Sequence, residues 1–228
     1  MSEINGSENG TSATPATDQS LQSGLEIVRA KRELRERLRA QRRTRSGSVA
    51  FNAQNPEVEP QMVEHLMDLI TTLPAGPVAC YLSLPTEPPT GLLREQLWEQ
   101  GYQPLIPRIE GTQLQWAMDL PDTTWDINQF GIAEPTNNFV SDQSEVLAQC
   151  VAIIIPAQAI DSNGMRLGQG KGFYDRALET VVHNPVRPLF IGYVFDNEHI
   201  DHVPHEAHDI PVDVSVTECA VRWFSTPD

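Results

Sequence analysis

The most constraining feature of the sequence is an apolar segment, VAIIIP at 151–156, which is followed closely by a glycine-rich loop and a helix-forming stretch. A run that is apolar on both faces is typical of a central strand in a parallel sheet. Further strand-forming segments, at 78–84, 102–109 and 188–195, alternate with helix-forming segments. This alternation favours an α/β fold. We therefore predict a three-layer α/β sandwich with a mostly parallel central sheet and helices on both faces.

Apolar spacing and turn residues predict the other elements. A small hairpin is expected at 109–118, turning at Gly111, and residues 213–224 supply one or two more strands. The region 119–142 reads as loop because it contains Pro and Gly at several positions. Helices are expected at 25–45, 57–73, 91–101, 143–149 and 173–183.

Composition limits the class of protein. Residues 1–24 are polar and have few apolar side chains, so we expect a disordered tail followed by a single domain over 25–228. The three cysteines lie far apart without a C-x-x-C motif, which excludes a disulfide framework and a cysteine-built zinc site. No apolar run reaches the roughly 20 residues that a membrane span needs.

The charge is unevenly distributed along the chain. The net charge is −15, yet nine of the 16 Lys and Arg residues lie between Arg29 and Arg45. This basic segment is either part of an anion-binding site or an arm that binds nucleic acid or an anionic membrane. An apolar stripe beside the basic one favours the first, because it indicates packing against the rest of the protein. The apolar stripe is Ile27, Ala30, Leu34 and Leu38, and the basic stripe is Lys31, Arg35, Arg39 and Arg42.

The stretch DSNGMRLGQGKGFYDR, at 161–176, carries the clearest chemical signal. Glycines alternate in it, at 168, 170 and 172, and leave backbone N–H groups open to an anion between a strand and a helix. Arg166 and Lys171 supply the positive charge that phosphates need. Asp175 is placed to hold a Mg²⁺ ion that bridges phosphate oxygens. The pattern therefore predicts a nucleotide phosphate site, and the alternative is a glycine-rich turn with incidental basic residues.

The loop differs from the two commonest phosphate-binding motifs. A Walker A loop would need Gly in place of Met165 and Ser or Thr in place of Gly172. The Rossmann fingerprint G-x-G-x-x-G fails at Phe173. A different kind of phosphate loop is therefore indicated.

The segment RLGQGKGFYDR closely resembles the signature of the 5-formyltetrahydrofolate cyclo-ligase family, also called methenyltetrahydrofolate synthetase. Other segments resemble the family in the same order, so that the resemblance covers about residues 29–224. They are the K-x-x-L-R element of Lys31, Leu34 and Arg35, YLSLPTEPPT at 81–90, Trp125, FGIAEP at 130–135 and HDIPVDVSVTE at 208–218.

The resemblance implies an enzyme that uses ATP and Mg²⁺ to convert 5-formyltetrahydrofolate to 5,10-methenyltetrahydrofolate, with release of ADP and phosphate. The formyl oxygen would be phosphorylated, and N10 would then close the ring. Such chemistry needs cations, N–H donors and a metal rather than a nucleophilic side chain. We expect a cytoplasmic monomer that acts on small molecules and binds neither nucleic acid nor membrane.

By resemblance, each part of the reaction has candidate residues. The catalytic pair is Arg166 and Lys171, and the metal ligands are Asp175 and Asp209, with Asp213 a weaker third candidate that also fits a strand start. The folate site is lined by Leu82, Glu87, Trp125, Phe173 and Tyr174. ATP is bound by Lys31, Arg35, Arg166, Leu167, Gly168, Gln169, Gly170, Lys171, Gly172, Phe173 and Tyr174.

The sequence departs from the family where P-G-x-x-F-D is usual before the loop. Here it reads PAQAID, with Ala157 in place of a glycine and Ile160 in place of an aromatic residue. Phe173 stands where a tyrosine is common. An alternative hypothesis is therefore a homologue that binds nucleotide or folate with weak turnover or none.

Two further groups of residues are interpreted as solvated. Four histidines are spaced by three around Pro204, which interrupts any helix that could carry a metal site. We also expect several arginines of the basic segment to lie on a solvated helix face. The histidines are His199, His202, His205 and His208, and the arginines are Arg39, Arg42, Arg43 and Arg45.

Overall fold

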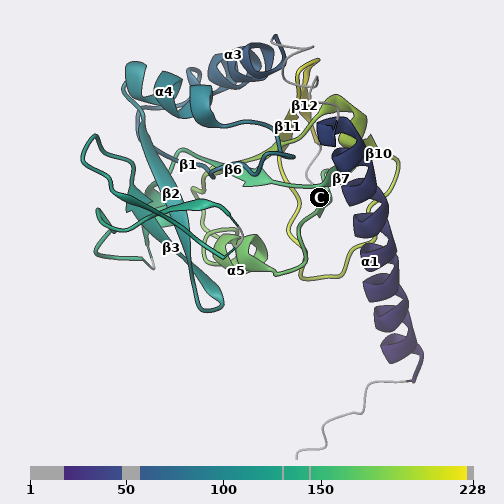
Figure 1. The fold of residues 1–228 in the computed structure, drawn as a ribbon. Coiled ribbons are helices and arrows are strands. Elements are labelled where there is room, and N and C mark those ends of the chain that lie inside the picture. The colour runs from purple at the N-terminus through teal and green to yellow at the C-terminus, as the bar shows by residue number, and fades with distance from the viewer. Residues whose placement is uncertain (1–17, 48–56, 130, 144, 225–228) are drawn as a thin grey trace, which may run out of the picture.

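The computed structural model describes residues 18–47, 57–129, 131–143 and 145–224. One seven-stranded sheet forms its centre (Figure 1). The strands are β1 (Pro77–Ala79), β2 (Gln103–Glu110), β3 (Gln113–Met118), β6 (Ala152–Pro156), β9 (Leu189–Tyr193), β11 (Val214–Val216) and β12 (Val221–Trp223).

These strands lie in the order β12-β11-β9-β6-β1-β2-β3. The inner strands pair in parallel, and only β3 and β12 at the two edges run antiparallel to their neighbours. Strand β6 lies between β1 and β9 and is parallel to both, as VAIIIP predicts. The expected hairpin is also present, because β2 and β3 turn at Gly111, which has a φ of 59°.

Helices cover both faces of the sheet, so the three-layer sandwich is confirmed (Figure 1). Because side chains alternate along a strand, Ile154 packs on one face of β6, while Ile153 and Ile155 pack on the other. The Ile154 face is covered by α3 (Val58–Ile70) and α4 (Gly91–Glu99). The other face is covered by α5 (Phe173–Glu179) and the short helix η1 (Val146–Gln149).

A second, three-stranded sheet of order β10-β7-β8 lies beside the main one. Its strands are β7 (Ala159–Asp161), β8 (Arg166–Leu167) and β10 (His199–Ile200). The glycine loop therefore follows β8 and not the buried strand β6 directly, which corrects the expected order. Short strands of two or three residues have too little periodicity to be recognised in a sequence.

The long helix α1 (Asp18–Gly47) packs on this second sheet. Leu34 and Leu38 contact a cluster that contains Leu167 and Val203, so the apolar stripe of the basic segment does face the protein. The helix begins at Asp18, before the expected boundary at Leu25. Residues 18–24 are therefore helical, and the rest of the expected tail, 1–17, lies outside the described residues.

The remaining elements are small. Strands β4 (Trp125–Ile127) and β5 (Ala133–Pro135) pair within the region expected to be loop. Strand β1 ends at Ala79, although a strand was expected to 84, and the chain continues from there into the loop that carries Glu87. A 3-10 turn, η2 (Asp196–Glu198), follows β9. Within the described ranges, no helix has the length and apolar character that crossing a membrane requires.

Candidate active site

The glycine loop, residues 168–172, connects β8 to α5. Gly170 has a φ of 94° and Gly172 a φ of 65°, a region that side chains other than glycine rarely adopt. A Cβ atom at Gly170 would also approach the Arg35 guanidinium to between 3.2 and 3.4 Å. Gly170 is therefore required both by its backbone conformation and by the close approach of α1.

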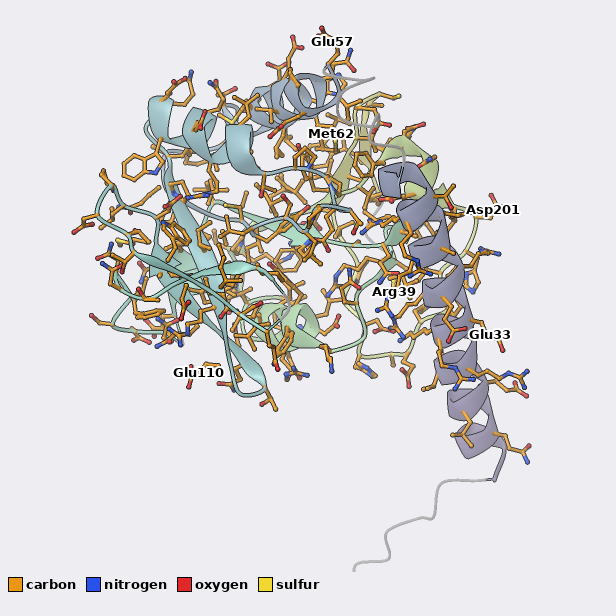
Figure 2. The ribbon with its side chains drawn as sticks, viewed as in Figure 1. Glu33, Arg39, Glu57, Met62, Glu110 and Asp201 are labelled. Atoms are coloured by element: carbon orange, nitrogen blue, oxygen red, sulfur yellow. The ribbon has the colours of Figure 1, made fainter. Side chains whose placement is uncertain are left out.

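Two arginines of α1 bind this loop. The Arg35 Nε donates a hydrogen bond to the Gly168 carbonyl at 2.9 Å, and Arg39 Nη2 donates to the Gln169 carbonyl at 3.0 Å. Figure 2 shows Arg39 on the side of α1 that faces the body of the protein, whereas Glu33 points away from it. The structure thus brings the basic helix and the glycine loop together.

Lys31 lies one turn earlier on the same face of α1. Its Nζ is 2.5 Å from Asp209 Oδ2 and 3.2 Å from Glu206 Oε2. Burial alone raises the pKa of Asp209, but the bonds from Lys31 and from the Glu206 N–H outweigh it, so the net pKa lies below the ordinary value. Asp209 is therefore ionised in the folded protein at neutral pH.

Arg166 and Lys171, the expected catalytic pair, lie in different environments. The Arg166 side chain is buried, and it contacts Asp175 Oδ1 at 2.5 Å and the Ile210 carbonyl. Lys171 is exposed, and among the described residues its ammonium group forms no ion pair. The loop therefore has one cation that is free to meet a ligand and one that is already neutralised by a carboxylate.

Arg35 interacts electrostatically with the charged groups on both sides of it. Burial and the nearby Arg39 lower its pKa, while the carboxylates of Asp209 and Asp175 raise it in part. Both expected metal ligands are therefore within electrostatic range of a single guanidinium. The two carboxylates lie far apart in the sequence, and the fold brings both near Arg35.

Glu87 reaches the loop from the segment after β1. Its Oε1 accepts a hydrogen bond from Gln169 Nε2 at 3.1 Å, and its Oε2 accepts the Leu84 N–H at 3.0 Å. Its side chain is 8% exposed. The expected folate carboxylate thus lies beside the expected nucleotide loop.

The other expected folate-lining residues are arranged less uniformly. The Tyr174 hydroxyl is buried, and this burial raises its pKa, as do the charges of Cys80 and Glu87. Phe173 lies under the Arg176 guanidinium at 5.4 Å. Leu82 packs at the margin of the core on the α3 side. Trp125 lies on β4 with the Arg94 guanidinium 5.0 Å from its ring, and no described hydrogen bond or ring contact joins it to the glycine loop.

Known proteins are similar to this chain in sequence over most of its length. The sequence profile of the 5-formyltetrahydrofolate cyclo-ligase family matches residues 27–218. The chain belongs to this family. The 5-formyltetrahydrofolate cyclo-ligase of Escherichia coli (strain K12) is 33% identical over 181 residues, which cover 75% of this chain and 96% of the relative. That of Haemophilus influenzae is 32% identical over 162 residues, which cover 70% and 84%.

Solved structures agree with the sequence match. The 5,10-methenyltetrahydrofolate synthetase of Aquifex aeolicus has a TM-score of 0.64 and 28% identity, over 87% of this chain and 94% of that one. The Mycoplasma pneumoniae synthetase, at 17% identity and a TM-score of 0.55 over 79% and 98%, shares the fold. The cyclo-ligase fold therefore extends over nearly all of the described residues.

The departures from the family pattern are absorbed by packing. The Ala157 carbonyl accepts a 2.7 Å hydrogen bond from Arg42 Nη2. The Ile160 side chain packs against Gly192 on β9. A Cβ atom added to Gly192 would be only 2.3 Å from Ile160 Cδ1. Neither substitution contacts the glycine loop through a described hydrogen bond.

The expected metal ligands fit a hard cation in part. Among the described residues, Asp175 Oδ2 and Asp209 Oδ1 form no hydrogen bond, so each carboxylate retains a free oxygen. No group of three or more His, Cys, Asp or Glu side chains that could hold a metal occurs in the described part of the chain. Mg²⁺ commonly takes one or two carboxylates and completes its shell with phosphates and water, so two carboxylates are sufficient.

Asp213 is fully engaged in another role. The Arg187 guanidinium donates hydrogen bonds to both Asp213 oxygens, at 2.7 and 2.6 Å, and the Phe190 N–H donates to Oδ2 at 2.8 Å. It directly precedes β11 and ties that strand to β9. The strand-start alternative therefore describes Asp213 better than a metal site.

The four histidines are spread along β10 and the segment that follows it. His199 lies half-buried on β10 and not in a solvated loop, which corrects the expectation for this residue. Its Nε2 is 3.0 Å from Ser215 Oγ, and burial lowers its pKa. His202 and His208 are largely exposed, at 3.9 Å from Asp161 and 4.0 Å from Glu206. His205 bonds the Val203 carbonyl at 3.0 Å.

Arg39 is exposed, as expected of a solvated face, but it also donates to the Gln169 carbonyl. Arg42 departs further from the expectation. It was expected on a solvated face, but its side chain is 4% exposed and pairs with Glu198 through two 2.7 Å hydrogen bonds. Arg43 is exposed as expected, and the Arg45 side chain lies outside the described residues. The available signal was spacing, because Arg42 follows Leu38 by four residues and so shares its face.

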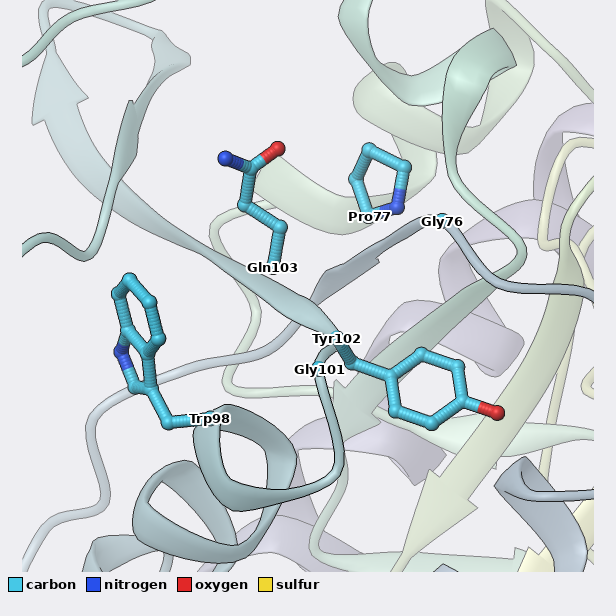
Figure 3. Close-up of a pocket in the computed structure, with 6 residues that line it drawn as sticks. All are labelled: Gly76, Pro77, Trp98, Gly101, Tyr102 and Gln103. Atoms are coloured by element: carbon cyan, nitrogen blue, oxygen red, sulfur yellow. The ribbon is translucent and has the colours of Figure 1, made fainter.

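The structure also has a surface hollow with a volume of about 350 Å³. Figure 3 shows the residues that line it. It forms where β1 and β2 begin, whereas the glycine loop and Glu87 lie beyond the ends of β6 and β1. Its location makes it no part of the candidate active site. The hollow is lined by Gly76, Pro77, Trp98, Gly101, Tyr102 and Gln103.

Proposed function

We propose that this chain is a 5-formyltetrahydrofolate cyclo-ligase that uses ATP to form 5,10-methenyltetrahydrofolate and releases ADP and phosphate. The observation that carries the proposal is the meeting of three segments at one place. The glycine loop lies between the cations of α1 and the Glu87 carboxylate, in a chain that matches the family over residues 27–218.

The reaction needs an activated formyl group. A formamide carbonyl is a poor electrophile, and its oxygen would attack the γ-phosphorus of ATP as the bond to ADP breaks. N10 then attacks the formyl carbon, the C–O bond to phosphate breaks as the ring closes, and the N10 proton is released. The protein's task is to align the two substrates and to stabilise phosphate charge.

The residues around the loop suit that task. Lys171 is the exposed cation available to ATP phosphates, and Lys31 and Arg35 add charge from α1. The loop's N–H groups, from Leu167 to Tyr174, contribute further donors. Arg166 acts through Asp175, since its guanidinium is already bonded to that carboxylate.

Glu87 is the proposed anchor of the reduced folate. A pterin presents adjacent N–H donors along one edge, and a carboxylate can accept two or more hydrogen bonds. Leu82, Phe173, Tyr174 and Trp125 are the proposed apolar walls.

Asp175 and Asp209 are the proposed Mg²⁺ ligands, each through the oxygen that no described hydrogen bond occupies. When bound, the ion would neutralise phosphate charge during transfer. The chain's own contribution is to hold both carboxylates beside cations, Asp209 beside Lys31 and Asp175 beside Arg166.

The test follows the rise of the methenyl absorbance with 5-formyltetrahydrofolate, ATP and Mg²⁺. We compare the wild type with Lys171→Met and Arg35→Gln, and use Arg29→Gln as the matched control on the same helix. We expect the band to grow in the wild type and the control, and a loss of at least about tenfold in kcat/KM for ATP in the two site variants.

Each other result has a definite meaning. Unchanged rates in both site variants would refute the loop as the phosphate site but would leave the proposed reaction supported. Absence of the band in a folded wild type that still binds both substrates would identify the weak homologue instead. The packing of Leu34 and Leu38 against the second sheet argues against a polyanion-binding arm, because such an arm would not be buried.

A further inference from the structure

The side chain of Gln169 lies between the proposed nucleotide and folate subsites. Its Nε2 donates to Glu87 Oε1 at 3.1 Å. Its Oε1 accepts two hydrogen bonds, from Gln158 Nε2 at 2.5 Å and from Arg39 Nη2 at 3.2 Å. One amide thus joins three other side chains, while its own backbone is part of the glycine loop.

The partners of this amide are held from different parts of the fold. Gln158 is completely buried between β6 and β7, and its N–H bonds the Leu167 carbonyl at 2.7 Å. Arg39 comes from α1 and also holds the Gln169 carbonyl. Glu87 is nearly buried, and its second oxygen is held by the Leu84 N–H. Movement of the glycine loop at Gln169 would therefore be transmitted to the Glu87 carboxylate.

We propose that Gln169 is a positioning residue that couples nucleotide binding to folate binding. The proposal rests on the proposed function, because it takes the glycine loop as the phosphate site and Glu87 as the folate anchor. It goes further by assigning a role to the side chain of a residue that was expected only as a member of the ATP-binding loop.

The physical basis is ordering of a shared element. The loop contains three glycines, and the Gln169 side chain is exposed, so a ligand that orders the loop also orders this amide. Glu87 Oε1 is then held in one position and keeps a lone pair for a pterin N–H. The second ligand meets a site that is already ordered, which gives positive cooperativity, and the effect must be reciprocal.

The test measures this coupling directly. Full-length protein is titrated with 5-formyltetrahydrofolate in the absence and presence of a non-hydrolysable ATP analogue with Mg²⁺, by calorimetry. The variants are Gln169→Met, which keeps the length and removes the amide, and Gln169→Glu, which opposes a second carboxylate to Glu87. The matched control is Gln96→Met, since Gln96 donates to Glu99 at 2.7 Å on the exposed surface of α4.

In the wild type and the control, we expect the analogue to tighten folate binding by at least about fivefold, the lower end of common allosteric coupling. In Gln169→Met, the factor should fall to within about twofold of one, while each ligand alone still binds. Gln169→Glu should lose the coupling too and bind folate more weakly, because like charges repel. The reverse titration, analogue with and without folate, must give the same factor in each protein.

Several results would overturn the proposal. They are a wild-type factor of one, a wild-type factor retained in both Gln169 variants, or the loss of a single ligand's binding in folded Gln169→Met, which would place the side chain in that ligand's own site. A folded wild type that binds neither ligand would refute the proposed function, and the coupling role with it. A wild type that binds both ligands and turns over, but shows no coupling, would refute this inference alone.

Discussion

Two arginines of α1 form ion pairs of similar length in contrasting surroundings. Arg29 Nε is 2.8 Å from Glu33 on the surface, with 74% of its side chain exposed. Arg42 is 2.7 Å from Glu198 and 4% exposed. One pair joins neighbours on the same helix, and the other joins α1 to the turn that follows β9.

The difference lies in which face of the helix each residue occupies. Lys31, Arg35, Leu38 and Arg42 follow one another at spacings of three and four, and all face the protein. The three charged residues have partners there. Lys31 pairs with Asp209, Arg35 bonds the glycine loop and Arg42 pairs with Glu198. Arg29 and Glu33 lie toward solvent, where water screens them. Equal distance between two charges therefore says little about what the pair contributes.

The largest effect should come from breaking the buried pair. Arg42→Met removes the guanidinium that donates to both Glu198 oxygens, and removing one partner of a buried pair costs about 3–5 kcal/mol. We expect a loss of that size in the free energy of unfolding, measured by urea denaturation.

The double variant Arg42→Met, Glu198→Leu separates charge from packing. It removes both charges and should recover most of the loss, since apolar replacements of buried pairs are often neutral. If Arg42→Met alone were as stable as the wild type, that result would contradict the burial of the Arg42–Glu198 pair.

The contact of Arg35 with the loop can be tested through two glycines. Gly170→Ala forces a side chain into a positive φ and toward the Arg35 guanidinium, so it should cost about 1 kcal/mol or more and raise KM for ATP. Gly168→Ala is the control, because its φ is not positive and no atom lies within 4 Å of the added Cβ.

The control should be as stable as the wild type, or more stable by up to about 1 kcal/mol. Equal stability losses in both variants would contradict both the positive φ of Gly170 and its close contact with Arg35. The comparison requires only urea midpoints and initial rates for the two proteins.

The Lys31 pair should be visible in the pH dependence of stability. The pKa of Asp209 is below its unfolded value of 3.8, so its contribution is fully present above that pH and is lost as the pH falls through the folded value. Lys31→Met removes the main partner. The stability difference between wild type and variant should thus be constant from pH 7 to about 5 and shrink below 3.8.

The measurement is urea unfolding of both proteins between pH 7 and 3. Glu206 and His208 are retained in the variant, but Glu206 also contacts Lys31, so the measured difference reports the loss of Lys31 from both Asp209 and Glu206. A difference that grows on acidification would contradict the direction of the Asp209 shift.

The smallest effect is expected at the exposed pair. Arg29→Gln should leave the urea midpoint unchanged within error, at low and at high salt, because solvent screens this pair. A clear loss of stability at low salt alone would show that the pair contributes and would weaken the contrast with Arg42.

Much of the fold was predictable because apolar pattern and turn chemistry are local properties. The central position of Ile153–Ile155 follows from a run apolar on both faces, and the turn at Gly111 follows from its glycine. The docking of α1 follows from Leu34 and Leu38. The second sheet was missed because β7 and β8 are too short to show a period.

The candidate site was predictable in its residue types but not in its pairings. Alternating glycines, Lys171 and Asp175 indicate a phosphate loop from sequence alone. Nothing in the sequence indicates that Arg166 bonds Asp175, or that Gln169 contacts Glu87. Long polar side chains can reach many partners, and the fold selects among them.

The sequence by itself determined the layers of this protein, its family and the residues of its glycine loop, because hydrophobic periodicity, glycine spacing and a run of ordered motifs are properties of neighbouring residues. The tertiary structure decided which charges are buried and with what. Lys31 meets Asp209, and Arg42 meets Glu198, only after helices and strands distant in the chain have packed. Burial then determines how much stability is lost when a pair is broken, because a buried charge depends on its partner far more than a charge that water solvates.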